Sequence, residues 1–480
     1  GLSAEYQADN NYFYNLAKQH IFSDNATLDC VYFDIANSVN SERDIPKIYR
    51  LLSPAYLLKE ITHADANDIN KNFYNELLHI IGLEEKTKNK KTVICRKGST
   101  RGKGSLIELV YNELETENKA SESVALQLCI LWINRLLFLK LLETQICRYK
   151  REEQKFLTCE KIRKFHALND LFFNVLGTEP NNRRDEFNKD FGNVPYLNSA
   201  LFEHNYIEQN NFFIRALNND IVLDYFSGTC LKEDKKNDTQ LTTLQYLLKF
   251  LDRYNFGSTE NTDIVDKDKV INASVLGKIF EKINGYKDGA VFTPSYITMY
   301  MCRETLQRAV IDKFNEKYGW QCANLTELYN DLEDKKQDEY NALINSLTIC
   351  DPAVGSGHFL VSALNEIIRI KSELGLLYHK GRKIKCSIDI QNDELIVSRG
   401  DEMFMYDYKD LDSQEIQECL FNEKKTIIEN CLFGVDINPN AVNICRLRLW
   451  IELLKNTYYK PETRYKELET LPNIDINIKC

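Results

Sequence analysis

The sequence lacks the usual marks of a zinc protein or of a disulfide-linked secreted protein. Its fourteen cysteines are scattered singly, with no C-x-x-C pair and no Cys/His cluster at the spacing of zinc ligands. Several cysteines lie in apolar contexts, such as Cys129 within a long apolar run. We therefore expect free, buried thiols in a reducing cytoplasm and no structural metal.

The sequence also lacks a secretory signal and an uninterrupted hydrophobic span. The longest apolar stretch, 124–146, is interrupted by Asn134, Arg135, Lys140 and Glu143. Charges at those intervals predict a buried amphipathic helix and argue against a membrane span. The N-terminal residues show no signal-peptide pattern, so no membrane partner is expected.

Overall positive charge, which proteins that coat nucleic acid need, is absent as well. The formal net charge is −10, although a local basic cleft is compatible with an acidic total. One segment, 84–105, is strongly basic. A solvated loop or hairpin is the plainer interpretation, and contact with a nucleic-acid phosphate backbone is the alternative. The candidate contacts are Lys90, Lys91, Arg96, Lys97 and Arg101.

The chain divides into two parts that differ in pattern. Residues 1–265 are predicted to form a mostly helical connector domain, as in 73–83, where apolar residues recur at three- and four-residue spacing. The polar segment 256–269 marks the boundary. Residues 266–480 contain two strand–turn–helix units, and an alternating segment near 380–410 predicts a β-hairpin insertion. The expected fold class is α/β, with an open, mostly parallel sheet after the helical domain.

The stretch SLTICDPAVGSGHFLVSALNEI, 346–367, places a turn with two glycines between a short strand and a helix. A P-loop needs a lysine after its last glycine, and here His358 and Phe359 follow Gly357. A dinucleotide fingerprint needs a third glycine for close helix–strand packing, and Leu360 occupies that position. Phosphate binding is therefore disfavoured at this turn.

A small ligand with a positive group fits the turn better. Asp351, at the end of the strand, supplies a carboxylate, and the two glycines let the backbone approach closely. Asp436 ends the next strand, where an acid can accept hydrogen bonds from both ribose hydroxyls. Thr293 and Pro294 begin a preceding helix, whose N-terminus favours a carboxylate. An ammonium group, a carboxylate and a ribose without phosphate describe S-adenosylmethionine.

Three short motifs carry a resemblance to a known family. DPAVGSGHF resembles the Asp-Pro-x-x-Gly-x-Gly motif of DNA adenine-N6 methyltransferases. GAVFTP resembles the motif that precedes it in those enzymes, and GVDINPNAV resembles the acidic motif that comes after it. Nearly the whole chain is similar to restriction–modification enzymes of type IIG, in the group found in Bacteroides-like bacteria.

This resemblance implies a Rossmann-like methyltransferase domain that uses S-adenosylmethionine, with its cofactor-binding N-terminal part in 266–480. It implies a cytoplasmic bacterial enzyme that acts on double-stranded DNA. The implied cofactor contacts are Thr293 and Pro294 at the methionine carboxylate, Asp351, Ala353, Gly355 and Gly357 in the methionine-binding loop, Asp436 on the ribose and Ile437 beside the adenine. Each also has a purely structural explanation, as a tight turn for the glycines and as helix caps for Thr293 and the two acids.

The catalytic motif of the family is missing from the sequence. No Asn-Pro-Pro-aromatic sequence occurs in the 480 residues. In the family, that motif accepts hydrogen bonds from the target amino group and stacks on the base, which must leave the duplex to be reached. We therefore expect no catalytic residue here, and a fragment that stops at Cys480 before the motif. No nuclease motif is seen, so restriction endonuclease activity is expected only of a full-length protein.

Three functions remain open on the sequence alone. The first is part of a restriction–modification enzyme that transfers methyl from S-adenosylmethionine to adenine N6 in DNA. The second is the modification subunit of a type I restriction system, which uses the same motifs with separate specificity and motor chains. The third is a scaffold that binds DNA and senses the cofactor without catalysis.

Overall fold

The computed structural model describes residues 70–480. Gaps in this description fall at 89–90, 99–101, 118, 120, 151–154, 193, 198–201, 257–270, 272, 285–292, 334, 392, 401, 466 and 470–476. The spacing of apolar residues also predicts a helix at 53–61, and this segment lies outside the described residues, as do Lys90 and Arg101.

Helices dominate the described residues up to 256, as the sequence predicted. Two strands form the only sheet in this described part, an antiparallel hairpin between β1 and β2 within the basic segment. The polar segment 232–240, whose composition favours a loop, contains a single helical turn. The elements are α5 Lys71–Ile81, β1 Leu83–Lys88, β2 Lys91–Arg96, α6 Leu106–Thr116, α7 Glu122–Lys150, α8 Phe165–Asp170, η2 Leu171–Leu176, η3 Pro180–Asn182, α9 Asp185–Phe191, α10 Tyr206–Asn210, η5 Ile214–Ala216, α11 Lys232–Lys236 and α12 Thr243–Asp252.

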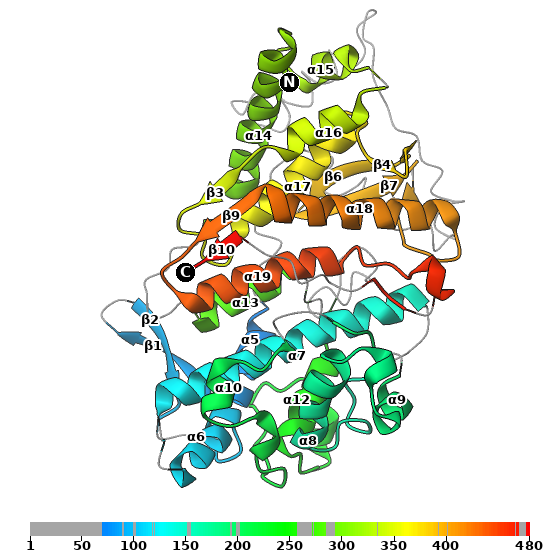
Figure 1. Ribbon diagram of the computed structural model, residues 1–480. Coiled ribbons are helices and arrows are strands. Elements are labelled where there is room, and N and C mark those ends of the chain that lie inside the picture. Colours follow the sequence, from blue (N-terminus) through cyan, green and yellow to red (C-terminus); the bar gives the residue numbers. More distant parts are fainter. Residues whose placement is uncertain are drawn as a thin grey trace, which may run out of the picture. The chain divides into compact units, whose positions relative to one another are not determined.

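From residue 271 the described chain alternates between helices and strands (Figure 1). The mixed helical and sheet character expected from the sequence is confirmed in this general form. The elements are α13 Ala273–Asn284, α14 Ser295–Tyr318, α15 Leu325–Asp331, α16 Gln337–Asn345, β3 Ile349–Asp351, α17 His358–Glu373, β4 Tyr378–His379, β5 Arg382–Lys383, β6 Ser387–Gln391, β7 Glu394–Arg399, β8 Glu402–Met403, α18 Leu411–Asn430, β9 Leu432–Val435, α19 Pro439–Leu454, η9 Pro461–Thr463 and β10 Asn477–Lys479.

Helix α5 shows how local chemistry fixes the ends of an element. The side chain of Asn70 accepts a hydrogen bond from the backbone N–H of Phe73, which caps the first turn. Gly82 ends the helix with φ +93, in the left-handed region where glycine is favoured. A glycine after an apolar helical pattern predicts a helix stop, and the structure confirms this stop at Gly82.

A parallel sheet of three strands positions the predicted site. Its order is β10-β9-β3, with β9 in the middle (Figure 1). Asp351 pairs with Gly434, and Lys479 pairs with Val435. Because parallel strands point the same way, their carboxyl ends meet at one edge of the sheet. The turn after β3 and the residues after β9 therefore lie next to each other.

Helices α17 and α19 pack on this sheet, and α14 packs on α17. Thr298 Oγ1 of α14 lies 2.9 Å from Ser362 Oγ of α17, and Cys302 Sγ of α14 lies 3.6 Å from the carbonyl oxygen of Phe359. Both contacts fall in the first two turns of α17. The start of α17, directly after the glycine turn, is thus fixed against α14.

The segment predicted to hold a β-hairpin contains β6 and β7, which pair antiparallel from Ser387–Ser398 to Gln391–Glu394. Strand β8 extends this small sheet through the pair Ser398–Met403. The hairpin is a separate sheet from β10-β9-β3, so it is an addition to the parallel sheet and not a continuation of it.

Helix α7 is long and apolar enough to cross a membrane by composition alone, yet 72% of its most apolar window is buried inside the molecule. The charges expected on the polar side of an amphipathic helix are buried as well. Arg135 pairs with Glu208 at 2.7 Å, and Lys140 pairs with Glu143 at 2.6 Å. Because Arg135, Lys140 and Glu143 each meet an opposite charge, the middle of α7 can be buried in protein.

Candidate functional site

The glycine turn, 351–357, connects β3 to α17 in a backbone path that only glycine follows without strain. Gly355 has φ +52 and Gly357 has φ +83, both in the left-handed region. At Gly357 a Cβ atom would lie 2.6 Å from Cys445 Sγ of α19. At Gly355 an added Cβ would meet only the carbonyl oxygen of Ala353, at 4.0 Å. Gly357 therefore allows close packing on α19, whereas Gly355 leaves open space beside the turn.

Asp436 binds this turn from the neighbouring strand. Its Oδ2 accepts a hydrogen bond from the backbone N–H of Gly355 at 2.9 Å. Its Oδ1 accepts from the backbone N–H of Asn438 at 2.8 Å, at the start of α19. The structure thus gives Asp436 the helix-cap role and also joins it to the predicted turn. A carboxylate has about four lone-pair positions, so two are left for a ligand.

Asp351 stands at the first position of the turn. Its Oδ1 accepts a hydrogen bond from the backbone N–H of Ala353 at 3.0 Å, which closes the turn at its start. The backbone N–H of Val354 donates to the carbonyl oxygen of Val435 at 2.9 Å. The turn is therefore held to the end of β9 by the backbone of Val435 and by the side chain of Asp436.

Thr293 and Pro294 lie where the chain enters α14. Pro294 occupies the N-cap position and is exposed, and no side chain caps this helix. Thr298, one turn later, is hydrogen-bonded to Ser362 of α17. The structure thus brings Asp351, Ala353, Gly355, Gly357 and Asp436 together, and it links Thr293 and Pro294 to them through the packing of α14 on α17.

Ile437 follows Asp436 and projects into solvent. Its side chain is 93% exposed, and Val435 before it is 44% exposed. Single exposed apolar side chains are common on protein surfaces, so the position of Ile437 is of interest because of its neighbour and not because of its exposure alone. Here an apolar surface stands directly beside the carboxylate of Asp436.

Arg448 is a contributor to the site that the sequence did not reveal. This α19 residue is 4% exposed, and its Nη1 donates to Ser356 Oγ at 3.2 Å in the glycine turn. It also packs on α13, where a Cβ on Gly277 would lie 2.8 Å from Arg448 Nε. In sequence it is one of two arginines in an apolar helix, and only the packing of α13, α19 and the turn distinguishes it.

The basic segment holds Arg96 in an internal ion pair. Its Nε and Nη2 donate to the two carboxylate oxygens of Glu108 at 2.6 and 2.5 Å, and its guanidinium lies 3.9 Å from the ring centroid of Tyr111. Lys97 Nζ lies 3.0 Å from His79 Nδ1, and burial lowers the pKa of this lysine.

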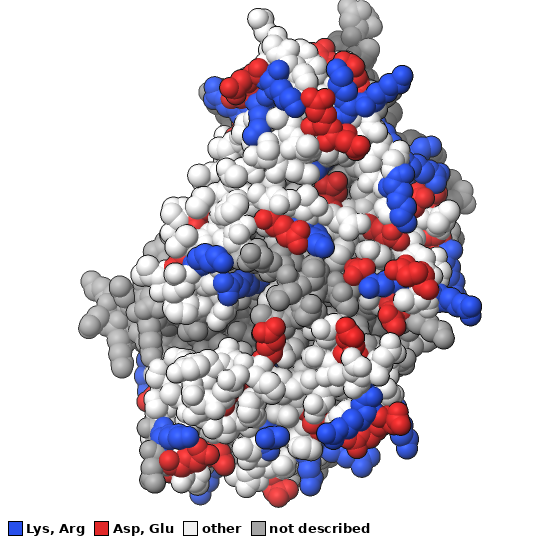
Figure 2. Space-filling view, in the orientation of Figure 1, with Lys and Arg blue, Asp and Glu red and all other residues white. Residues whose placement is uncertain are grey.

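Lys91 begins β2, opposite Lys88. On the face drawn in Figure 2, basic and acidic side chains of the described residues are interspersed and form no broad area of one sign. Contact between this segment and DNA stays a prediction.

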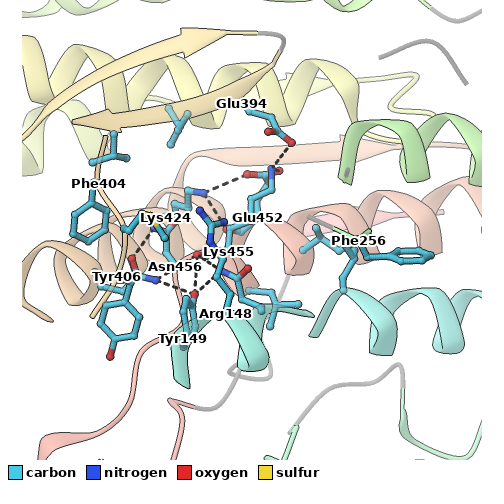
Figure 3. Close-up of a pocket in the computed structure, with 18 residues that line it drawn as sticks. Arg148, Tyr149, Phe256, Glu394, Phe404, Tyr406, Lys424, Glu452, Lys455 and Asn456 are labelled. Atoms are coloured by element: carbon cyan, nitrogen blue, oxygen red, sulfur yellow. Dashed lines mark hydrogen bonds and ion pairs between the residues drawn. The ribbon is translucent and has the colours of Figure 1, made fainter. Parts of the chain in front are cut away.

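A separate cavity of about 140 Å³ lies between α7, the hairpin strands and the end of α19 (Figure 3). Glu452 accepts hydrogen bonds from Lys424 Nζ at 3.2 Å and from Lys455 Nζ at 2.7 Å. Although burial opposes ionisation, these two lysines lower the pKa of Glu452 to about 2. Lys455 Nζ also lies 3.6 Å from Glu394. The charges satisfy one another, and none of the predicted site residues lines this cavity.

Comparison with known proteins gives a relative for most of the chain. Over 470 residues the chain is 28% identical to the putative type II restriction enzyme and methyltransferase of Methanocaldococcus jannaschii, covering 90% of this chain and 34% of that protein. The chain is similar to a restriction and modification protein. It spans about a third of the length of this relative.

Two further comparisons concern parts of the chain. A family model described as a domain of unknown function, DUF7814, matches residues 66–271. Among solved structures, the type IIL restriction–modification enzyme MmeI in complex with DNA matches with a TM-score of 0.39 and 16% sequence identity. That match covers 77% of this chain and 39% of the other. A TM-score this low does not establish a shared fold.

Proposed function

We propose that the glycine turn and Asp436 bind S-adenosylmethionine. We propose further that the chain is part of a type IIG enzyme that methylates adenine N6 in double-stranded DNA. The observation that carries the proposal is the bond from Gly355 N–H to Asp436 Oδ2. It places an acid beside a glycine turn at the carboxyl edge of parallel strands, which is where open α/β sheets bind ligands.

The residues at this edge fit the parts of the cofactor. Asp436 retains acceptor capacity for the ribose hydroxyls, and the exposed Ile437 offers an apolar surface to the adenine ring. The open space beside Gly355 admits the methionine portion, whose ammonium group fits the carboxylate of Asp351. Thr293, Pro294 and the N-terminus of α17, which no side chain caps, favour the methionine carboxylate. When bound, the cofactor supplies an electrophilic methyl group on a sulfonium.

The same geometry disfavours a nucleotide phosphate. No lysine follows Gly357, and Leu360 is fully buried in the first turn of α17, where a dinucleotide fold has its third glycine. The contribution assigned to these residues is to bind and orient the methyl donor. Because no Asn-Pro-Pro-aromatic sequence occurs in the chain, no residue is assigned to the methyl transfer itself.

Isothermal titration with S-adenosylmethionine tests the proposal. We expect the wild-type chain to bind, and Asp436→Ala to bind at least about tenfold more weakly, because the variant loses the ribose acceptor and the bond to the turn. Asp410→Ala is the matched control, since Asp410 Oδ1 accepts from a backbone N–H two residues later, as Asp436 Oδ1 does, at the start of another helix.

The proposal fails if the folded wild-type chain does not bind S-adenosylmethionine. It fails equally if Asp410→Ala weakens binding as much as Asp436→Ala does. A parallel titration with ATP distinguishes a site for S-adenosylmethionine from a site for a nucleotide phosphate. We expect no binding of ATP at this turn.

A further inference from the structure

The turn of the β6–β7 hairpin is buried, although such turns normally lie on the surface. Asp393 in this turn is 2% exposed and has φ +64, a conformation that aspartate tolerates better than most residues. Its backbone N–H lies 3.2 Å from Met299 Sδ of α14. Its carbonyl oxygen accepts from Asn365 Nδ2 of α17 at 2.9 Å. The tip of the hairpin therefore contacts both α14 and α17, the two helices that begin at the candidate site.

A line of buried oxygen atoms runs from this tip to the start of α14. Asp393 Oδ1 lies 2.8 Å from Ser362 Oγ, which lies 2.9 Å from Thr298 Oγ1. Thr298 Oγ1 in turn lies 2.9 Å from the carbonyl oxygen of Ser295. Ser295 is the first residue of α14 and follows Pro294 directly. We call Asp393, Ser362, Thr298 and Ser295 the hairpin-tip relay.

The protonation state of Asp393 decides which group donates each hydrogen bond in the hairpin-tip relay. Each hydroxyl has one proton to donate, and a carbonyl can only accept. When Asp393 is protonated, its O–H donates to Ser362, Ser362 donates to Thr298, and Thr298 donates to the carbonyl of Ser295. When Asp393 is ionised, Ser362 must donate to the carboxylate. Thr298 then has one proton for two acceptors, Ser362 Oγ and the carbonyl oxygen of Ser295. One of these two contacts is therefore left without a hydrogen bond.

The surroundings of Asp393 favour its neutral form. Among the described residues its Oδ2 has no hydrogen-bond partner, and the adjoining cavity of about 10 Å³ has room for one water molecule at most. Burial raises the pKa of this carboxyl to about 7, although Arg448 and the bond from Ser362 oppose the rise. The charged and titratable groups that face it are Glu394 of β7, Arg448 and Glu452 of α19, Lys455 after α19 and the thiol of Cys302 in α14.

We propose that Asp393 is a positioning residue for the cofactor site, because its neutral form completes the relay that fixes the first turn of α14 against α17. Thr293 and Pro294 lie directly before α14, and the glycine turn lies directly before α17. By fixing α14 against α17, the relay therefore fixes Thr293 and Pro294 relative to the glycine turn. This inference rests on the proposed function of the site.

The test measures the dissociation constant for S-adenosylmethionine by titration calorimetry from pH 6 to pH 8.5. For the wild type we expect affinity to fall about threefold to tenfold as pH rises through 7, the effect of one lost hydrogen bond. Asp393→Asn keeps the shape and the left-handed turn, and its amide can donate to Ser362 as the neutral acid does. We expect the affinity of Asp393→Asn to match that of the wild type at pH 6 and to exceed it about threefold to tenfold at pH 8.5. Ser362→Ala removes the middle of the relay, so its affinity is reduced at every pH.

Two controls lie on the same hairpin. Asp389→Asn and Ser387→Ala change exposed residues and are expected to follow the wild-type pH profile. The α-amino group of the cofactor titrates in the same range, but it does so equally with every variant, so the difference between variants isolates Asp393.

The possible outcomes distinguish a failure of the proposed function from a failure of the inference about Asp393. A wild type that binds no S-adenosylmethionine at any pH overturns the proposed function, and the inference with it. A wild type that binds, together with an Asp393→Asn variant of unchanged pH profile or a Ser362→Ala variant of unchanged affinity, overturns the inference alone. Urea unfolding of each variant verifies that the chain titrated is folded.

Discussion

At the scale of single residues, the two glycines of the turn have different reasons to be glycine. Gly355 borders open space, and its left-handed φ alone excludes most side chains. Gly357 has the same backbone constraint and also lies against Cys445 of α19. A substitution at Gly357 therefore combines backbone strain with a steric overlap.

We expect Gly357→Ala to lower the free energy of unfolding by about 2–6 kcal/mol, since a strained φ costs of order 1–3 kcal/mol and overpacking adds about as much. Gly400→Ala is the matched control, because Gly400 has φ +63 with nothing within 4 Å of an added Cβ. Urea denaturation of both variants gives the difference. Equal losses for the two would show that the contact with Cys445 is unimportant.

The sequence could predict which residues meet at the turn, but not which residues support it. Asp351 and Asp436 each follow a short apolar strand, and parallel neighbours bring such positions to one edge. Asp393 lies in a polar hairpin turn that reads as exposed. Its burial depends on α14 and α17, far away in sequence, and no local pattern records that packing. The same holds for Arg448, whose partner Ser356 is 92 positions away.

At the scale of elements, α7 is held by a buried ion pair. Arg135 and Glu208 are both fully buried, and Glu208 accepts a further hydrogen bond from Trp132 Nε1 at 2.7 Å. The apolar run of α7 predicted the helix correctly. Its charges were expected to mark a polar side, whereas α10 supplies a carboxylate that allows Arg135 to be enclosed.

Arg135→Met is expected to destabilise the chain by about 3–5 kcal/mol, because it leaves the Glu208 carboxylate buried without its partner. The double variant Arg135→Met, Glu208→Leu removes both charges and should recover a large part of that loss. Arg399→Met, in an exposed pair with Asp412, should change stability by less than about 1 kcal/mol. Chemical denaturation checks all three, and a double variant less stable than Arg135→Met contradicts the argument.

At the scale of the whole molecule, the raised pKa of Asp393 has a consequence for stability. Between about pH 4 and pH 7 an unfolded aspartate is ionised, whereas native Asp393 retains its proton. The native state then binds more protons than the unfolded state, so this group's contribution to stability falls as pH rises through that window and levels off above about 7.

The measurement is the difference in free energy of unfolding between wild type and Asp393→Asn at pH values from 4 to 8. We expect the wild type to lose stability relative to the variant as pH rises to 7, and no further change above it. Asp389→Asn should show no such trend relative to the wild type. A difference that is constant with pH would mean that Asp393 does not titrate in this range.

Strand β10 supports Asp436 from the far side of β9, and it is made later in the chain than the residues it supports. The backbone N–H of Asp436 donates to the carbonyl oxygen of Lys479 at 3.1 Å, and Arg446 donates to the carbonyl oxygen of Ile478 at 2.6 Å. The glycine turn and Asp436 precede β10 in the chain, so they are synthesised before it. Until β10 pairs, β9 is an open edge and the acid beside the turn lacks its outer support. The outer support of Asp436 is therefore complete only after residues 477–479 have been made and have paired with β9.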